Sequence, residues 1–149
     1  MSEGDITLVL KRTIRASKRR LFSAWTDPEQ LVKWWGPAWV RCSAAELDLR
    51  VGGHYRIDNA LPDGSVAVIS GTFERVSPPD ELVYTWHLGG HPAEGAADSR
   101  VTVRFDETQP GTTDVIIVHE RIASAAIRDD HEKGWLGCLD SLEQHLAAA

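Results

Sequence analysis

Apolar residues recur with a period of two along most of the chain. Ile6, Leu8 and Leu10 fall on one parity at the start, and this period predicts a strand with one buried face. Six later segments with the same period predict six more strands, at residues 45–50, 55–57, 66–76, 82–86, 101–105 and 115–120. Turn signals such as Gly52-Gly53 and Pro62-Asp63-Gly64 separate them.

Two short helices are predicted between the first strand and the second. Ser17 can cap a helix that presents Leu21, Phe22 and Trp25 on one face. Directly afterwards, Asp27 can cap a second helix, with Pro28 at its first position and Gln30 completing a capping-box pattern. Leu31, Trp34 and Trp35 supply the apolar face of this second helix, and Gly36-Pro37 ends it.

The C-terminal segment changes to a helical period. Its apolar stripe steps by four, three and four residues and predicts one long helix over residues 130–146, capped by Asp129. His131 lies on the same stripe, four residues before Trp135. Gly134 and Gly137 each cost such a helix about 1 kcal/mol relative to Ala. Close packing on a sheet would explain the two glycines, and so would space left for a ligand.

The order of elements is strand, two short helices, six strands and one long helix. Strands and helices do not alternate, so the sheet is predicted to be antiparallel and the class to be α+β. We find no internal repeat and no linker, and we expect residues 1–149 to form one domain. The Gly- and Ala-rich segment 89–99 is predicted to be a mobile loop.

Composition narrows the class of partner. Apolar residues make up 42% of the chain, and a net charge of −6 argues against a basic face for nucleic acid or an anionic membrane. No secretory signal and no run of 18 apolar residues is visible. The two cysteines are widely separated, which favours reduced thiols in a cytoplasmic protein. Six tryptophans are unusual for this length and suggest a core or pocket with aromatic walls.

Six segments carry a resemblance to a known family. They are AWTDPE at 24–29, WWGP at 34–37, DLRVGGHY at 48–55, GTFERV at 71–76, Pro78-Pro79 with Leu82 and Thr85-Trp86, and Gly134-Trp135 with Leu139 and Leu142. In this order and spacing they closely resemble the single-domain bacterial branch of the AHSA1-like family, named after the activator of Hsp90 ATPase. That family belongs to the START / Bet v 1-like (SRPBCC) superfamily. The resemblance extends from about Ile6 to Leu146.

The resemblance implies a helix-grip fold, in which a curved seven-stranded antiparallel sheet wraps around the long C-terminal helix. It also implies a cavity between sheet and helix, which in relatives accepts hydrophobic molecules. We expect one wall to come from the helix stripe, the opposite wall from the sheet, and the mouth from the end of the second short helix. The expected helix wall consists of His131, Trp135, Leu139 and Leu142. The expected sheet wall consists of Leu47, Tyr55, Ile57, Phe73, Trp86 and Phe105. Trp34 and Trp35 are expected near the mouth.

Two polar residues are candidates for groups inside this cavity. Arg12 falls on the inward parity of the first strand, and His119 on the inward parity of the last. Because these strands should be neighbours, we expect Arg12 to be partly buried and paired with Glu120 or His119. The pair is either structural or holds a ligand carboxylate or a substrate carbonyl.

No constellation for other chemistry is visible in the sequence. The six histidines show no paired metal spacing, the cysteines have no obvious histidine partner, and the glycines form no phosphate loop, so we expect no metal and no cofactor. Binding of a small hydrophobic molecule is therefore the first hypothesis. An enzyme of the polyketide cyclase/hydrolase type, using Arg12, His119 or His131, is the second. A chaperone partner of Hsp90 is the third and least favoured, and a homodimer is left open.

Overall fold

The computed structural model describes residues 6–36, 40–89 and 99–148. It contains seven strands and three helices, in the order that the sequence predicts. These are β1 (Ile6–Ile14), α1 (Lys18–Thr26), α2 (Pro28–Trp34), β2 (Arg41–Leu47), β3 (His54–Ala60), β4 (Val66–Ser77), β5 (Glu81–Gly89), β6 (Ser99–Gln109), β7 (Thr112–Ile122) and α3 (Ala125–Ala148). Most of the predicted mobile loop, residues 90–98, lies outside the described residues.

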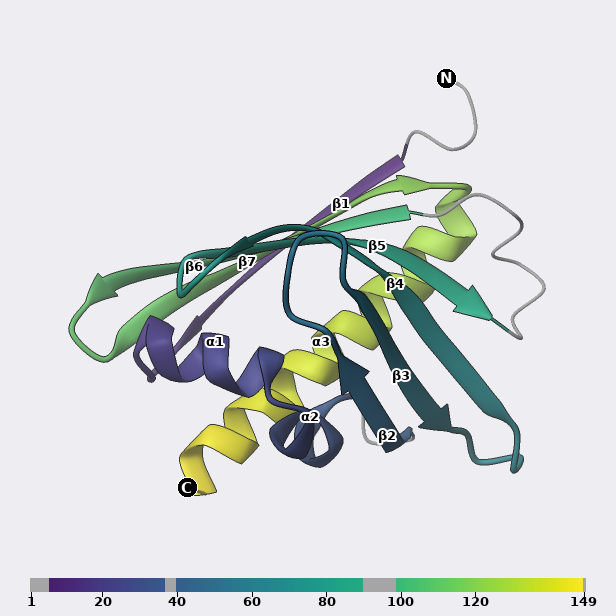
Figure 1. The fold of residues 1–149 in the computed structure, drawn as a ribbon, viewed down its shortest axis with the longest axis horizontal. Coiled ribbons are helices and arrows are strands. Elements are labelled where there is room, and N and C mark those ends of the chain that lie inside the picture. Colours follow the sequence, from purple (N-terminus) through teal and green to yellow (C-terminus); the bar gives the residue numbers. More distant parts are fainter. Residues whose placement is uncertain (1–5, 37–39, 90–98, 149) are drawn as a thin grey trace.

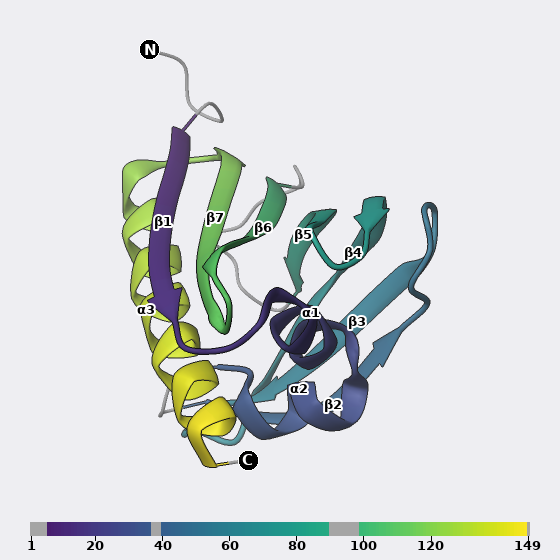
Figure 2. The same ribbon diagram turned by 90° about the vertical axis from the view of Figure 1, so that its left-hand side faces the viewer.

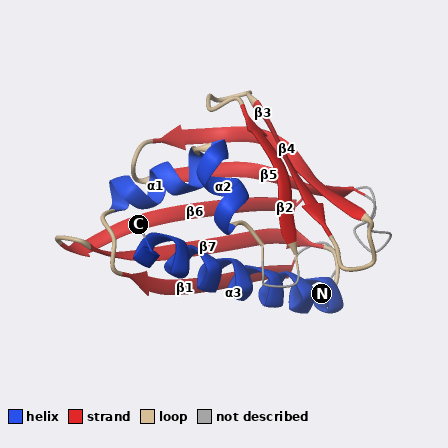
Figure 3. Ribbon diagram, turned by 90° about the horizontal axis from the view of Figure 1, so that it is seen from below, coloured by secondary structure: helices blue, strands red, loops and turns tan. Residues whose placement is uncertain are grey.

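The strands form a single antiparallel sheet in the order β1-β7-β6-β5-β4-β3-β2. The sheet curves strongly, and α3 runs along the side formed by β1 and β7 (Figures 1 and 2). Helices α1 and α2 cover the same face of the sheet, nearer to β2 (Figure 3). The predicted α+β helix-grip architecture is therefore confirmed.

Side-chain caps define where the two short helices begin. The Ser17 Oγ accepts a hydrogen bond from the Arg20 amide at 3.2 Å, as predicted for the cap of α1. At α2, the Asp27 Oδ1 accepts from the Glu29 amide at 3.0 Å. The Gln30 side chain donates to Asp27 Oδ2 at 3.2 Å, so it supports the capping carboxylate.

The predicted start of the long helix is wrong. Helix α3 begins at Ala125, five residues before the predicted start, and Asp129 lies within it. The Ser124 Oγ accepts from the Ile127 amide at 3.3 Å and takes the capping position expected of Asp129. The apolar stripe also continues one step back, because Ile127 is buried four residues before His131. The earlier start gives α3 an extra turn and a half with which to cover the sheet.

The sheet is irregular where β4 and β5 pair. Their register shifts between Phe73 and Arg75, and the Thr72 amide donates to the Thr85 side chain at 2.9 Å. A Cβ at Gly71 would lie only 2.1 Å from the Thr85 carbonyl oxygen, so only glycine fits at this position. The same carbonyl accepts a hydrogen bond from the Tyr55 hydroxyl at 2.6 Å. A side chain of β3 thus stabilises the close approach of β4 and β5.

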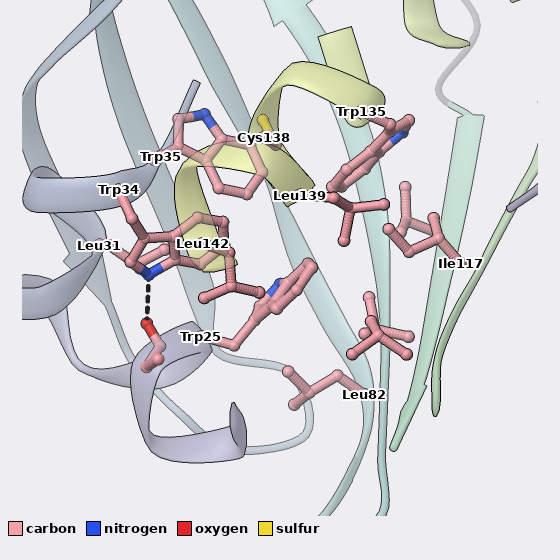
Figure 4. Close-up of a cluster of buried hydrophobic side chains, with 14 of the residues drawn as sticks. Trp25, Leu31, Trp34, Trp35, Leu82, Ile117, Trp135, Cys138, Leu139 and Leu142 are labelled. Carbon is pink, nitrogen blue, oxygen red and sulfur yellow. Dashed lines mark hydrogen bonds between the residues drawn. The ribbon is translucent and has the colours of Figure 1, made fainter. Parts of the chain in front are cut away.

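Tryptophan side chains dominate the core between the helices and the sheet. Trp25 lies close to Trp34 and is stacked on Trp135, at ring-centroid distances of 5.0 and 6.2 Å. Figure 4 shows these rings with Leu139 and Leu142 of α3, and with Leu82 and Ile117 of the sheet. The rings join α1, α2 and α3 into one cluster. None of the described helices is long and apolar enough to cross a membrane.

Candidate functional site

A small apolar cavity lies between the two short helices and the β2–β5 half of the sheet. Its volume is about 20 Å³, close to the space that one water molecule needs. Helices α1 and α2 each contribute one side chain to its lining, Trp35 directly after α2 contributes a third, and strands β2–β5 contribute six. They are Trp25, Leu31, Trp35, Leu47, Tyr55, Ile57, Phe73, Leu82 and Tyr84. Every lining side chain is apolar or aromatic, which suits a hydrophobic guest.

Five of the residues expected to border a ligand line this cavity: Trp35, Leu47, Tyr55, Ile57 and Phe73. Four further lining residues were not predicted from the sequence as site residues: Trp25, Leu31, Leu82 and Tyr84. Trp25 and Leu31 were recognised as apolar helix residues, but the periodicity of a helix does not show which strands it covers. Leu82 and Tyr84 share the inward parity of Trp86, and this parity is the signal that could have found them.

The other expected wall residues lie elsewhere in the core. Phe105, Leu139 and Leu142 are at most 3% exposed and pack among the helices and the central strands. Trp34, expected near the mouth, is 1% exposed, and its Nε1 donates to the Ala24 carbonyl at 2.9 Å (Figure 4). Trp86, His131 and Trp135 lie around His119 and do not line this cavity.

His119 is the centre of a buried chain of hydrogen bonds. Its side chain is fully buried, as its inward parity predicts. The Trp135 indole Nε1 donates to His119 Nδ1 at 3.1 Å, and His119 Nε2 lies 2.7 Å from Ser99 Oγ. Ser99 Oγ in turn donates to the Trp86 carbonyl at 3.4 Å. The His131 ring stacks on His119 with centroids 4.3 Å apart.

These contacts fix the protonation of His119. An indole nitrogen can only donate, so Nδ1 must be the acceptor and the proton must sit on Nε2, from which it is donated to Ser99. Burial, together with the neighbouring His131, lowers the pKa of His119 to about 2. A neutral imidazole with both nitrogens engaged is poorly suited to general acid–base catalysis near neutral pH. The arrangement therefore gives His119 a structural role.

The indole N–H of Trp86 differs in its hydrogen bonding from those of three other core tryptophans. Trp25, Trp34 and Trp135 each donate their indole N–H to an atom of the protein. The Trp86 Nε1 is buried, and among the described residues it has no hydrogen-bond partner. Its ring lies 5.4 Å from Trp135 and 6.2 Å from Trp35, measured between centroids.

The expected pairing of Arg12 with Glu120 or His119 is wrong. The Arg12 guanidinium donates instead to Asp140 at 2.9 Å and to Glu143 at 2.8 Å, both on α3. Glu120 pairs with Arg100 of the adjacent strand at 3.1 Å. Arg12 is partly buried, as expected, because α3 lies over β1 and brings two carboxylates to it. These bonds raise the pKa of Arg12, which stays charged and points to the helix.

The two cysteines are unsuited to nucleophilic chemistry. Cys42 and Cys138 are free, as predicted, and both are buried. Burial raises the pKa of both thiols, that of Cys138 to about 12, which disfavours the reactive thiolate. Within the described residues, no group of three or more histidine, cysteine or acidic side chains could hold a metal ion.

Comparison with known proteins identifies relatives over nearly the whole chain. The family model described as Activator of Hsp90 ATPase homolog 1-like protein matches residues 15–147. An AHSA1 protein from Silicibacter pomeroyi is 25% identical with a TM-score of 0.83, covering 96% of this chain and 99% of its own. A protein from Chromobacterium violaceum is also 25% identical, with a TM-score of 0.80 and coverages of 93% and 94%.

The protein CalU16 from Micromonospora echinospora is 27% identical, with a TM-score of 0.70, and the match covers 93% of this chain and 74% of that one. No protein of curated function matches the sequence significantly.

Proposed function

Because this chain belongs to the family of Activator of Hsp90 ATPase homolog 1-like proteins, we propose that it binds a small hydrophobic molecule in the cavity between α1–α2 and β2–β5. The observation that carries the proposal is the lining, in which nine side chains surround a space without a single charged group. The fold supports it, since hydrophobic ligands are commonly bound on folds of this kind. Neither a cofactor nor a protein partner is needed.

The cavity must widen to accept more than one water molecule. Rings and aliphatic side chains from α1 and α2 form one side of the lining, and these short helices are the part of the wall outside the sheet. A ligand that removes about 300 Å² of apolar surface from water gains roughly 7 kcal/mol. After association costs of roughly 4 kcal/mol or more, about 3 kcal/mol remains, which corresponds to weak binding in the millimolar range.

The chemistry of the lining favours binding over catalysis. It contains no histidine, cysteine, carboxylate or lysine, so the usual acids, bases and nucleophiles are missing from it. Its two titratable groups are Tyr55 and Tyr84, and burial raises the pKa of Tyr84 above its ordinary value. Neither His119 nor His131, the two histidines considered as bases, lines this cavity.

A cavity-enlarging variant tests the proposal. Leu82 lines the cavity and is 1% exposed, so Leu82→Ala should cost about 3–5 kcal/mol of stability and leave more space. We expect α-methylstyrene to raise the Tm of the wild type and to raise that of Leu82→Ala by more, because a ligand bound only by the folded state stabilises it. Differential scanning calorimetry measures both shifts.

Leu146→Ala is the matched control, since Leu146 is buried but lies outside the lining. Its Tm shift with α-methylstyrene should equal that of the wild type. Native mass spectrometry of the purified protein adds an independent check, because a retained hydrophobic molecule would appear as extra mass. If α-methylstyrene raises the Tm of neither the wild type nor Leu82→Ala, the proposal is contradicted.

A further inference from the structure

Two tyrosines belong to the cavity lining, and the hydrogen bonds of their hydroxyl groups differ. The Tyr55 hydroxyl donates to the Thr85 carbonyl at 2.6 Å, so its hydrogen is used within the sheet. The Tyr84 oxygen accepts from the Trp25 indole at 3.5 Å. Among the described residues, no acceptor is found for the Tyr84 hydroxyl hydrogen itself.

Within the part of the chain that the structure describes, the Tyr84 hydroxyl is therefore a buried donor without an acceptor. Its side chain is 5% exposed, and burial raises its pKa, so the phenol keeps its hydrogen. Trp25 can only donate, which means that the O–H bond of Tyr84 has to point away from the indole. A buried donor without an acceptor is unfavourable, and native proteins seldom leave one without a reason.

We propose that Tyr84 donates this hydrogen to an uncharged acceptor oxygen, such as a carbonyl or ether, on the hydrophobic molecule that the cavity binds. The proposal rests on the function proposed above and defines the ligand class more closely. A carboxylate is disfavoured, because the lining offers no cationic side chain to balance a buried negative charge. A pure hydrocarbon is disfavoured because it leaves the Tyr84 donor unpaired.

Three probes of nearly equal shape distinguish these ligand classes. Acetophenone carries a ketone, α-methylstyrene replaces its oxygen with a CH₂ group, and benzoate carries a carboxylate. Dissociation constants are measured by calorimetric titration for the wild type and for Tyr84→Phe. For each protein, the preference is the dissociation constant of α-methylstyrene divided by that of acetophenone. The informative quantity is the preference of the wild type divided by that of Tyr84→Phe. The different hydration of the two probes cancels in this ratio.

We expect this ratio to be about fivefold, as one neutral hydrogen bond implies. Thr113→Val is the matched control. It removes another buried hydrogen bond, from Thr113 Oγ1 to the Ala16 carbonyl at 2.7 Å, outside the cavity lining. In Thr113→Val the preference should equal that of the wild type. The infrared C=O band of bound acetophenone should also lie at lower frequency in the wild type than in Tyr84→Phe.

The outcomes separate this proposal from the function on which it rests. If α-methylstyrene binds and the ratio is one, the cavity binds hydrophobic molecules but Tyr84 does not select them. If benzoate binds most tightly to the wild type, the preference for an uncharged acceptor is overturned. If no probe binds, the cavity itself is not a binding site and both proposals fail.

Discussion

The His119 ring remains neutral because it is fully buried and because both of its nitrogens are already engaged. In an unfolded chain the same ring is exposed to water and titrates near pH 6.5. The folded pKa of about 2 is therefore far below the unfolded value. Folding stability depends on pH wherever the two states bind different numbers of protons.

The sign of this dependence follows from the lowered pKa. The stabilisation that depends on a neutral His119 is fully present above about pH 6.5. It is lost as the pH falls, because His119 takes up a proton in the unfolded chain before it does so in the folded protein. We expect the free energy of unfolding to decrease by roughly 1.4 kcal/mol per pH unit between pH 6 and 5. Urea denaturation at several pH values measures this slope.

His119→Gln is the control for the pH effect, since glutamine can form hydrogen bonds but does not titrate. Its unfolding free energy should change less between pH 6 and 5 than that of the wild type. Burial also lowers the pKa of His145. In both proteins His145 therefore adds a smaller pH dependence of the unfolding free energy, in the same direction. Equal slopes in the two proteins would show that His119 is not the group responsible.

Periodicity predicted the burial of individual residues better than their partners. The inward parity of β7 correctly placed His119 in the core. The parity of β1 also indicated that Arg12 is partly buried, but not that Asp140 and Glu143 lie opposite it. Those carboxylates are three residues apart on α3, and their position depends on how the helix crosses the sheet. Spacing along one strand contains no information about that crossing.

Among the elements, α3 and β4 contain glycines in opposite surroundings. A Cβ added at Gly134 of α3 would meet nothing within 4 Å, so close packing on the sheet does not explain this glycine. A Cβ at Gly71 would collide with the Thr85 backbone. The same substitution should therefore have opposite effects at the two positions.

We expect Gly134→Ala to stabilise the protein by up to about 1 kcal/mol, because alanine is the better helix former and nothing obstructs its methyl group. For a chain of this size, that corresponds to a rise in Tm of about 3 °C. Gly71→Ala should lower the Tm, since the strands must separate to make room. Thermal unfolding followed by circular dichroism compares the variants, and a lower Tm for Gly134→Ala would contradict the expectation.

The types of element were predictable from the sequence, but one boundary and one placement were not. Asp129 followed by Glu132 has the pattern of a helix cap, yet Ser124 occupies the capping position because the chain turns away from β7 there. The amphipathic faces of α1 and α2 were also clear. Which strands they cover is set by the tertiary packing, and for this reason Trp25 and Leu31 were missed as cavity residues.

At the scale of the whole molecule, Arg12 connects the first strand of the chain to the last helix. The side chain of Arg12 is 25% exposed, and those of Asp140 and Glu143 are 65% and 42% exposed. Solvent screens such pairs strongly, so each contributes little despite its short distance. The position of α3 over β1 must depend mainly on buried apolar contacts.

A double-mutant cycle tests this estimate. We expect Arg12→Gln and Glu143→Gln to be coupled by about 0.5 kcal/mol in the free energy of unfolding, and the coupling should fall as salt is added. Lys11 and Asp114 form a longer pair at 3.4 Å on neighbouring strands and serve as a comparison. A coupling of several kcal/mol would mean that the Arg12 cluster holds the helix in place.

The fold as a whole was predictable because alternating strands followed by a helix admit few topologies and because the family motifs fix the order. The cavity was predictable in part. Its sheet side followed from strand parity, as Tyr55, Ile57 and Phe73 show. We expected α3 on its helical side, whereas Trp25, Leu31 and Trp35 line it there, because the sequence does not show which helix lies over which strands.

The strand order has a consequence for how the chain acquires its structure. β1 is made first but pairs with β7, so that Ile14 meets Thr113 and Leu10 meets Ile117. A ribosome must therefore release most of the chain before its first strand finds a neighbour, and until then an apolar edge is exposed to other nascent proteins. Contacts over such long sequence separations also slow folding. Synthesis from the N-terminus thus leaves β1 without its strand partner until β7 has been made.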